Sequence, residues 1–160
     1  FAARVSLRVG KIIAIERHPK ADKLYIEQVD MGDGQRTIVS GLVPYYTEEE
    51  LMGRNIIVVS NLKAAKLRGV ESQGMLLAAS VKNEDGSELV EVLFAEDAEP
   101  GTDVLLEGLD TSFNGEEIDI DTFFQLPILA KEGTIYVDKH RLLVKGQALA
   151  SKRVLNGEVG

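Results

Sequence analysis

The chain contains no cysteine, and its longest stretch without a charged residue is short. Without thiols there can be neither a disulfide framework nor a thiolate metal site, and nothing requires an oxidising compartment. Ser72 to Val81 is an uncharged stretch of ten residues and Thr37 to Thr47 one of eleven, whereas a membrane-spanning helix needs roughly twenty. The N-terminus lacks a signal-peptide pattern. We therefore expect a cytoplasmic protein with no membrane partner.

Motifs for catalysis and cofactor binding are also missing. The sequence has no G-x-S-x-G nucleophile motif and no phosphate-cradling G-x-x-x-x-G-K-[ST]. Its two histidines, His18 and His140, lie far apart, and His18 precedes Pro19, which predicts a turn. We expect Asp22 to bond local backbone amides there. We therefore expect no enzyme activity, no metal site and no cofactor.

Positive charge is scarce in one half of the chain only. The net charge is -8, but residues 1–80 have 11 Lys and Arg against 9 Asp and Glu, whereas residues 81–160 have 7 against 17. The first half thus carries +2 and the second -10. Because polyanions are bound mainly through Lys and Arg, such a distribution lets one half meet a nucleic acid while the other faces solvent or a protein.

Alternating apolar residues predict five strands in the first half. A long strand from Val5 to Ile15 should bend near Gly10 or the Ile12-Ile13 pair. Residues 24–30 and 36–40 should form a hairpin around Gly32-Asp33-Gly34. A short helix capped by Thr47 should follow, and then strands at 55–59 and 74–79. This order is typical of a five-stranded OB barrel, whose face and loops bind oligonucleotides.

The second half gives weaker signals. A strand is expected at 89–94, a partly helical segment at 118–130 despite Pro127, and a hairpin from 134–137 and 141–144. The chain has 160 residues and begins with Phe1 rather than Met, which suggests a domain of a longer polypeptide. The fold class we predict is mainly β, with an OB-fold barrel at 1–100 and a smaller C-terminal β/α unit at 101–160 packed on it.

The segment from Ser60 to Val70 joins the last two barrel strands and contains Lys63, Lys66 and Arg68 but no acid. Elsewhere acids are interleaved with nearly every base. This predicted loop should therefore be a local positive pole, and each of its cations can pair with a phosphate. On composition alone, the simpler interpretation of a solvated loop with ordinary lysines is favoured.

Several motifs together make the sequence resemble the tRNA-binding domain family over about half its length. They occur in the family's order: Arg8-Val9-Gly10-Lys11-Ile12-Ile13, His18-Pro19-Lys20-Ala21-Asp22-Lys23-Leu24, Val39-Ser40-Gly41-Leu42, Asn61-Leu62-Lys63-Ala64-Ala65-Lys66-Leu67-Arg68-Gly69 and Glu71-Ser72-Gln73-Gly74-Met75. The family includes a dimeric bacterial tRNA-binding protein, the tails of many methionyl-tRNA synthetases and the endothelial monocyte-activating polypeptide II domain.

The resemblance implies which residues face tRNA. They are Arg36, Ser40, Asn61, Lys63, Lys66, Arg68, Ser72, Gln73 and Met75, which would hold the phosphate backbone and the elbow shape with little sequence reading. Met75 has an alternative role in core packing, and Asn61 and Ser72 have one in capping the ends of the loop.

In the second half, Val144-Lys145-Gly146 and the following residues resemble the extra unit of the polypeptide II subgroup. The resemblance implies a monomer with pseudo-dimer geometry, because that unit imitates the dimer interface of the shorter bacterial proteins. A lysine-rich stretch of the animal and fungal relatives is replaced here by the acidic Glu116 to Asp121. We therefore expect this half to add little tRNA affinity.

The function implied is a non-catalytic tRNA-binding module appended to an aminoacyl-tRNA synthetase of methionyl, tyrosyl or lysyl type, or to an associated tRNA-binding cofactor. The partners expected are tRNA and the linked catalytic domain or a multi-synthetase complex. Two alternatives remain open. Arg8 to Ile13 resembles a stretch tied to cytokine activity in animal relatives, although strand alternation already explains it, and the acidic half could make the chain an interaction scaffold.

Overall fold

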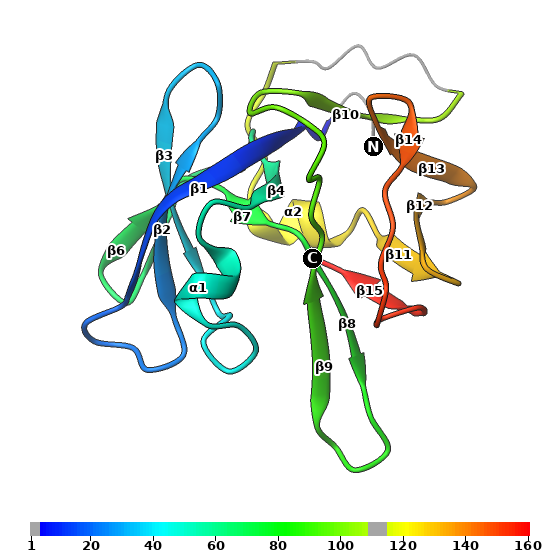
Figure 1. Cartoon of the computed structure of the whole chain (residues 1–160). Coiled ribbons are helices and arrows are strands. Elements are labelled where there is room, and N and C mark those ends of the chain that lie inside the picture. The colour runs from blue at the N-terminus through cyan, green and yellow to red at the C-terminus, as the bar shows by residue number, and fades with distance from the viewer. Residues whose placement is uncertain (1–3, 109–114) are drawn as a thin grey trace.

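The computed structural model describes residues 4–108 and 115–160 (Figure 1). Over these ranges the protein is mainly antiparallel β-structure with two short helices, α1 (Glu48–Leu51) and α2 (Ile120–Phe124). The strands are β1 (Leu7–Arg17), β2 (Tyr25–Asp30), β3 (Gln35–Ser40), β4 (Asn55–Val59), β5 (Ala65–Leu67), β6 (Val70–Ser72), β7 (Met75–Leu76), β8 (Ala78–Lys82), β9 (Glu88–Val92), β10 (Asp103–Leu106), β11 (Ile128–Lys131), β12 (Thr134–Val137), β13 (His140–Val144), β14 (Gln147–Ala148) and β15 (Gly157–Val159).

Within the barrel, strand β1 is shared between β4 and β2, as an OB-like fold requires. Its first part, Leu7 to Lys11, pairs with β4, and its second part, Lys11 to Arg17, pairs with β2. The register shifts between Ile12 and Ala14, which is a β-bulge at the predicted Ile pair. A Cβ on Gly10 would lie 2.5 Å from Cγ1 of Val29, so glycine permits the close packing of β1 on β2.

The β2–β3 hairpin and helix α1 also confirm their predictions. Gly32 has φ +85° in the turn between the strands, and Met31 N–H donates to the carbonyl of Gly34 at 2.8 Å. Thr47 and Glu50 form a reciprocal capping box at the start of α1. Leu51 is fully buried and fixes this short helix to the barrel.

Two predicted elements differ in the structure. The strand expected at 74–79 is divided into β7 and β8, because β7 pairs with β4 whereas β8 pairs with β9 and β15. The segment expected to be partly helical at 118–130 forms α2 over five residues only. It then continues as β11 directly after Pro127, which cannot lie in a helix interior without breaking it.

The predicted hairpin of the second half is β12–β13, and its neighbours connect the half to the barrel at two edges. Strand β10 pairs with β1, and β15 pairs with β8. The path of paired strands runs β3-β2-β1-β10-β13-β12-β11-β15-β8-β9 without closing, and Figure 1 shows β10 to β15 beside the barrel strands.

Strand β4 separates two hydrophobic clusters because it is buried on both faces. Ile56 and Val58 point into the barrel with Ile12 and Ile38. Ile57 and Val59 point the other way, into a cluster that also contains Phe123, Ile135 and Leu142 of the second half. One core thus crosses the boundary predicted between residues 100 and 101. That boundary stays a prediction, although the second half clearly packs on the barrel.

Candidate nucleic-acid interface

The basic segment predicted as a loop is a β-hairpin. Strands β5 and β6 pair antiparallel with Lys66 opposite Glu71. The turn is Arg68-Gly69, and both residues have positive φ, +53° and +88°, as in the type I′ turn that fits the twist of a two-stranded hairpin. The hairpin therefore presents its cations in a defined arrangement rather than on a mobile loop.

Three cations of this region are exposed: Lys63 just before β5, Lys66 on β5 and Arg68 in the turn. In the described part of the chain, Lys66 and Arg68 have no ion pair and no side-chain hydrogen bond. Lys63 lies near Asp119, whose pKa is lowered first by the N–H of Thr122 and further by the Lys63 charge. Unpaired cations keep their full charge for an external anion.

Arg36 braces the base of the hairpin. It is half-buried on β3, and its guanidinium donates to the carbonyls of Ser60 and Gln73. Burial, with the nearby Arg8 charge, lowers the pKa of Arg36. Gln73 is exposed but pairs with Thr37: its N–H donates to the Thr37 carbonyl at 2.7 Å, and its Oε1 accepts from the Thr37 N–H at 2.8 Å. These bonds join the end of β6 to β3.

Three of the predicted contact residues are buried and bonded within the protein. Asn61 donates to the carbonyls of Arg4 and Glu116 and accepts from Ser6 N–H. Ser72 Oγ accepts from Val39 N–H at 3.0 Å and donates to Gly74 O at 2.9 Å. Asn61 therefore links the barrel to the second half, and Ser72 links the hairpin to β3.

Ser40 is bonded to a buried carboxyl group. Its Oγ lies 2.5 Å and 2.8 Å from the two oxygens of Glu27, which is fully buried. A proton on the carboxyl group would let it donate to Oγ while the hydroxyl donates to the other oxygen. Burial raises the pKa of Glu27 to about 8, although the Ser40 bond opposes the shift. The pair is thus a neutral, internally satisfied unit at the end of β3.

His18 connects to the hairpin in a way that the sequence did not indicate. Its Nδ1 accepts from Lys20 N–H at 3.0 Å, which places the ring proton on Nε2. Nε2 lies 3.1 Å from the carbonyl of Leu67 and donates to it. His18 is indeed in a turn, as predicted, but it also tethers the basic hairpin to the β1–β2 connection. No local signal shows this bond, because its partners are 49 residues apart.

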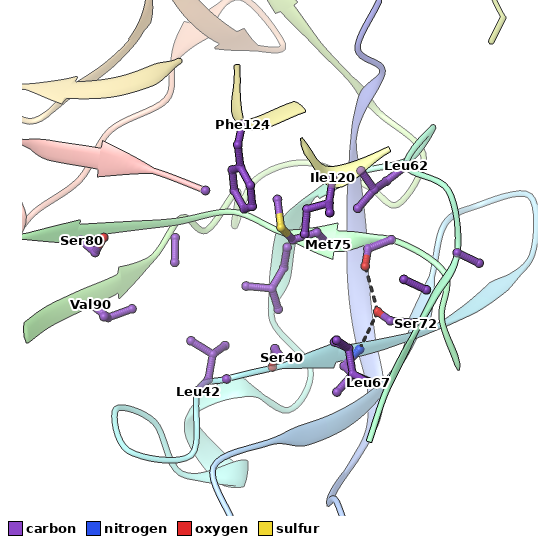
Figure 2. A pocket seen from close by; sticks show the side chains of 18 of the residues that line it. Ser40, Leu42, Leu62, Leu67, Ser72, Met75, Ser80, Val90, Ile120 and Phe124 are labelled. Atoms are coloured by element: carbon purple, nitrogen blue, oxygen red, sulfur yellow. Dashed lines mark hydrogen bonds between the residues drawn. The ribbon is translucent and has the colours of Figure 1, made fainter. Parts of the chain in front are cut away.

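A pocket of about 660 Å³ lies beside the hairpin (Figure 2). Met75 lines it and also packs against the core at the barrel's second-half face, so both roles considered for it are compatible. Leu67 and Lys63 from the hairpin region, and Ile120 and Phe124 from α2, complete much of its wall. The basic hairpin therefore has an apolar hollow on one side.

Residues 4–108 and 115–160 contain neither a cluster of metal-ligating side chains nor a membrane-spanning helix. No three His, Asp or Glu side chains in these ranges converge on a point where an ion could be held. Likewise, neither of the two short helices there has the length or apolar character to cross a bilayer.

Comparison with known proteins agrees with this geometry. The family model described as "Putative tRNA binding domain" matches residues 7–103. Methionine--tRNA ligase of Treponema denticola is 46% identical over 173 residues, which cover 100% of this chain and 22% of that protein. Cytoplasmic tyrosine--tRNA ligase of Danio rerio is 53% identical over 83 residues, covering 51% of this chain and 16% of that protein. The chain thus spans less than a quarter of the length of these relatives.

A solved structure extends the similarity to the whole fold. The crystal structure of the C-terminal domain of Plasmodium vivax p43 superposes with a TM-score of 0.88 at 26% identity, covering 100% of this chain and 99% of that one. The family model ends at residue 103, whereas the match to this solved structure also covers the second half. The second half is therefore part of a known arrangement. With its barrel, its basic hairpin and the match over residues 7–103, the chain belongs to the tRNA-binding domain family.

Proposed function

We propose that this chain binds tRNA through the basic hairpin and the adjoining end of β3, and so raises the tRNA affinity of an aminoacyl-tRNA synthetase to which it is joined. The observation that carries the proposal is the hairpin itself. Lys66 and Arg68 are exposed and unpaired within the described residues, on a protein whose net charge is -8. The high identity to a methionine--tRNA ligase supports a methionyl enzyme as the parent.

Within this surface we assign two roles. The contact residues are Lys63, Lys66, Arg68 and Gln73, because their side chains are exposed, with Arg36 reaching the edge. The positioning residues are Ser40, Asn61 and Ser72, because they are buried and bonded within the protein. Contacts of this kind hold the phosphate backbone and give little sequence selectivity.

The benefit to the parent would come from effective concentration. A module that holds tRNA weakly, joined to a catalytic body, turns a bimolecular encounter into a local one. We propose that the module acts in the cytoplasm as a monomer, and that the second half stands where a dimer partner stands in shorter relatives. The proposed place of the second half is supported by the hydrophobic core that Ile57 and Val59 of the barrel share with Ile135 of the second half.

The test compares two lysines in matched positions. Lys66 lies opposite Glu71 in the basic hairpin, and Lys82 lies opposite Glu88 in the β8–β9 hairpin, both exposed. In titrations of bulk tRNA at several salt concentrations, Lys66→Ala should weaken binding and flatten the slope of log K against log salt by about 0.7 to 0.9. Lys82→Ala should do neither. Equal effects of the two variants would contradict the assignment of the hairpin.

A further inference from the structure

The pocket beside the basic hairpin has four walls from separate parts of the fold (Figure 2). Ile120 and Phe124 come from α2, Leu67 from β5, Ser40 and Leu42 from the end of β3 and the residues just after it, and Val90 from β9. Its volume of about 660 Å³ lies in the range of sites that bind small molecules. Unlike the core, this space is open to solvent beside the interface already described.

Phe124 is the most exposed of the large apolar side chains in the described residues, at 58%. It directly follows the buried Phe123, which anchors α2 in the core. Asp119 caps the start of the helix, and its carboxylate accepts from Thr122 N–H at 2.8 Å. The ring is therefore held at the pocket edge by a fixed element and has an aromatic face available to a ligand.

One face of the β5–β6 hairpin is charged, and the other face is apolar. Because successive side chains of a strand point to opposite faces, Ala65 and Leu67 face the pocket while Lys66 points away. Lys63 lies at the pocket rim. A strand of RNA whose phosphates contact Lys63 and the hairpin tip would thus have its bases within reach of an apolar hollow.

We propose that the pocket takes one unstacked tRNA base, which stacks on Phe124 while the hairpin cations hold the neighbouring phosphates. This inference rests on the proposed function and names a subsite of that interface. Exposed bases of folded RNA are commonly bound by stacking on aromatic side chains. The base supplies a planar, neutral face that matches the apolar walls.

The polar groups of the pocket favour a neutral ligand over an anion. Lys63 is balanced by the nearby carboxylate of Asp119, and Glu88 also lines the pocket, so the phosphate itself belongs outside. In the part of the chain that the structure describes, the Ser80 hydroxyl has no hydrogen-bond partner. It is available to the edge of a base. An apolar peptide would leave this hydroxyl unpaired and gain nothing from the cations.

The experiment measures tRNA binding by Phe124→Leu, which keeps an apolar side chain but removes the aromatic face. We expect roughly tenfold weaker binding, an unchanged slope of log K against log salt, and recovery in Phe124→Tyr. Leu155→Ala, at another exposed apolar side chain, is the matched control and should bind like the parent chain. Circular dichroism and thermal melting verify that each variant is folded.

Three outcomes would overturn the proposal. Phe124→Leu could bind tRNA as tightly as the parent, or its salt slope could fall as it does in Lys66→Ala, which would show a displaced hairpin rather than a lost stacking contact. A leucine-rich peptide could also bind in a Phe124-dependent way without competing with tRNA. If Lys66→Ala weakens binding but Phe124→Leu does not, only the base subsite fails. If neither does, the proposed function fails first.

Discussion

The β5–β6 and β8–β9 hairpins of this protein place a lysine opposite a glutamate in the same way but are built for different tasks. In β5–β6 the turn is Arg68-Gly69, and the cations are unpaired within the described residues. In β8–β9 the turn region contains acids, and Asp85 accepts from both N–H and Oγ of Ser87. The β5–β6 turn therefore presents an unpaired cation to a partner, whereas the acid Asp85 of the β8–β9 turn is bonded locally to Ser87.

The two hairpins also differ in the ionisation of the buried glutamate that lies near each of them. Beside the basic hairpin, Glu27 is bonded to Ser40, and burial raises its pKa to about 8. Within β9, burial alone would raise the pKa of Glu91, but N–H donors from Lys152, Arg153 and Val154 lower it overall. A similar carboxyl group is therefore neutral under one hairpin and ionised under the other, because only Glu91 has several donors.

The largest effect expected is on the stability of the β8–β9 side. Glu91→Ala leaves three backbone N–H groups without their acceptor, and that of Val154 is buried. We expect a loss of about 2–3 kcal/mol of unfolding free energy, measured by urea denaturation at pH 7. Glu88→Ala, at an exposed position of the same strand, should cost little. The folded Glu91→Ala protein should still bind tRNA normally. Weakened binding would contradict the assignment of tRNA binding to the β5–β6 hairpin and not to the β8–β9 hairpin.

The second effect is a pH dependence that comes from Glu27. The folded protein keeps this proton up to about pH 8, whereas the unfolded chain releases it near its ordinary pKa of about 4.3. Stability therefore falls as the pH rises between these values, by up to about 1.4 kcal/mol per pH unit. Glu27→Gln should remove this loss, so that the variant gains on the parent chain from pH 5 to pH 8 in thermal melts. A constant difference between the two would show that Glu27 is already ionised.

The smallest effect should come from the tether of the basic hairpin. His18→Leu removes the donor to Leu67 O and the acceptor for Lys20 N–H. We expect faster amide hydrogen exchange in residues 65–72 but not in β8–β9, and tRNA binding weaker by roughly threefold, because an untethered hairpin must be ordered on binding. His18→Gln, which can still donate, should retain part of the affinity. Unchanged exchange in both hairpins would show that the bond does not restrain β5–β6.

Most of the barrel could be predicted because its strands are long and strongly patterned. The alternation around Val9 and Ile12, the Gly32 turn and the Thr47 cap each have a local cause. The β5–β6 hairpin could not be predicted in the same way. Its strands have three residues each, and Arg68 adopts a positive φ that Asn, Asp or Gly usually signals. The hairpin can be recognised only from the pairing of β5 with β6 in the structure, for example of Ala65 with Ser72.

The candidate site shows the same limit at the level of single residues. The resemblance named Ser40, Asn61 and Ser72 beside Lys66 and Arg68, since motifs do not reveal which way a polar side chain points. Their partners lie far along the chain: Glu27 is 13 residues from Ser40, and Arg4 is 57 from Asn61. The buried or exposed state of such residues depends on those contacts, which no local pattern encodes.

By itself, the sequence determined the barrel strands, the asymmetry of charge between the halves and the position of the basic segment, because these follow from alternation, composition and motif order. Tertiary structure alone decided that this segment is a hairpin tethered by His18, that Glu27 is buried and neutral, and that an apolar pocket lies between Leu67 and Phe124. The physical reason is that the tether, the buried glutamate and the pocket all lie at contacts between separate elements. Hydrogen bonding, desolvation and cavity shape depend on how those elements pack.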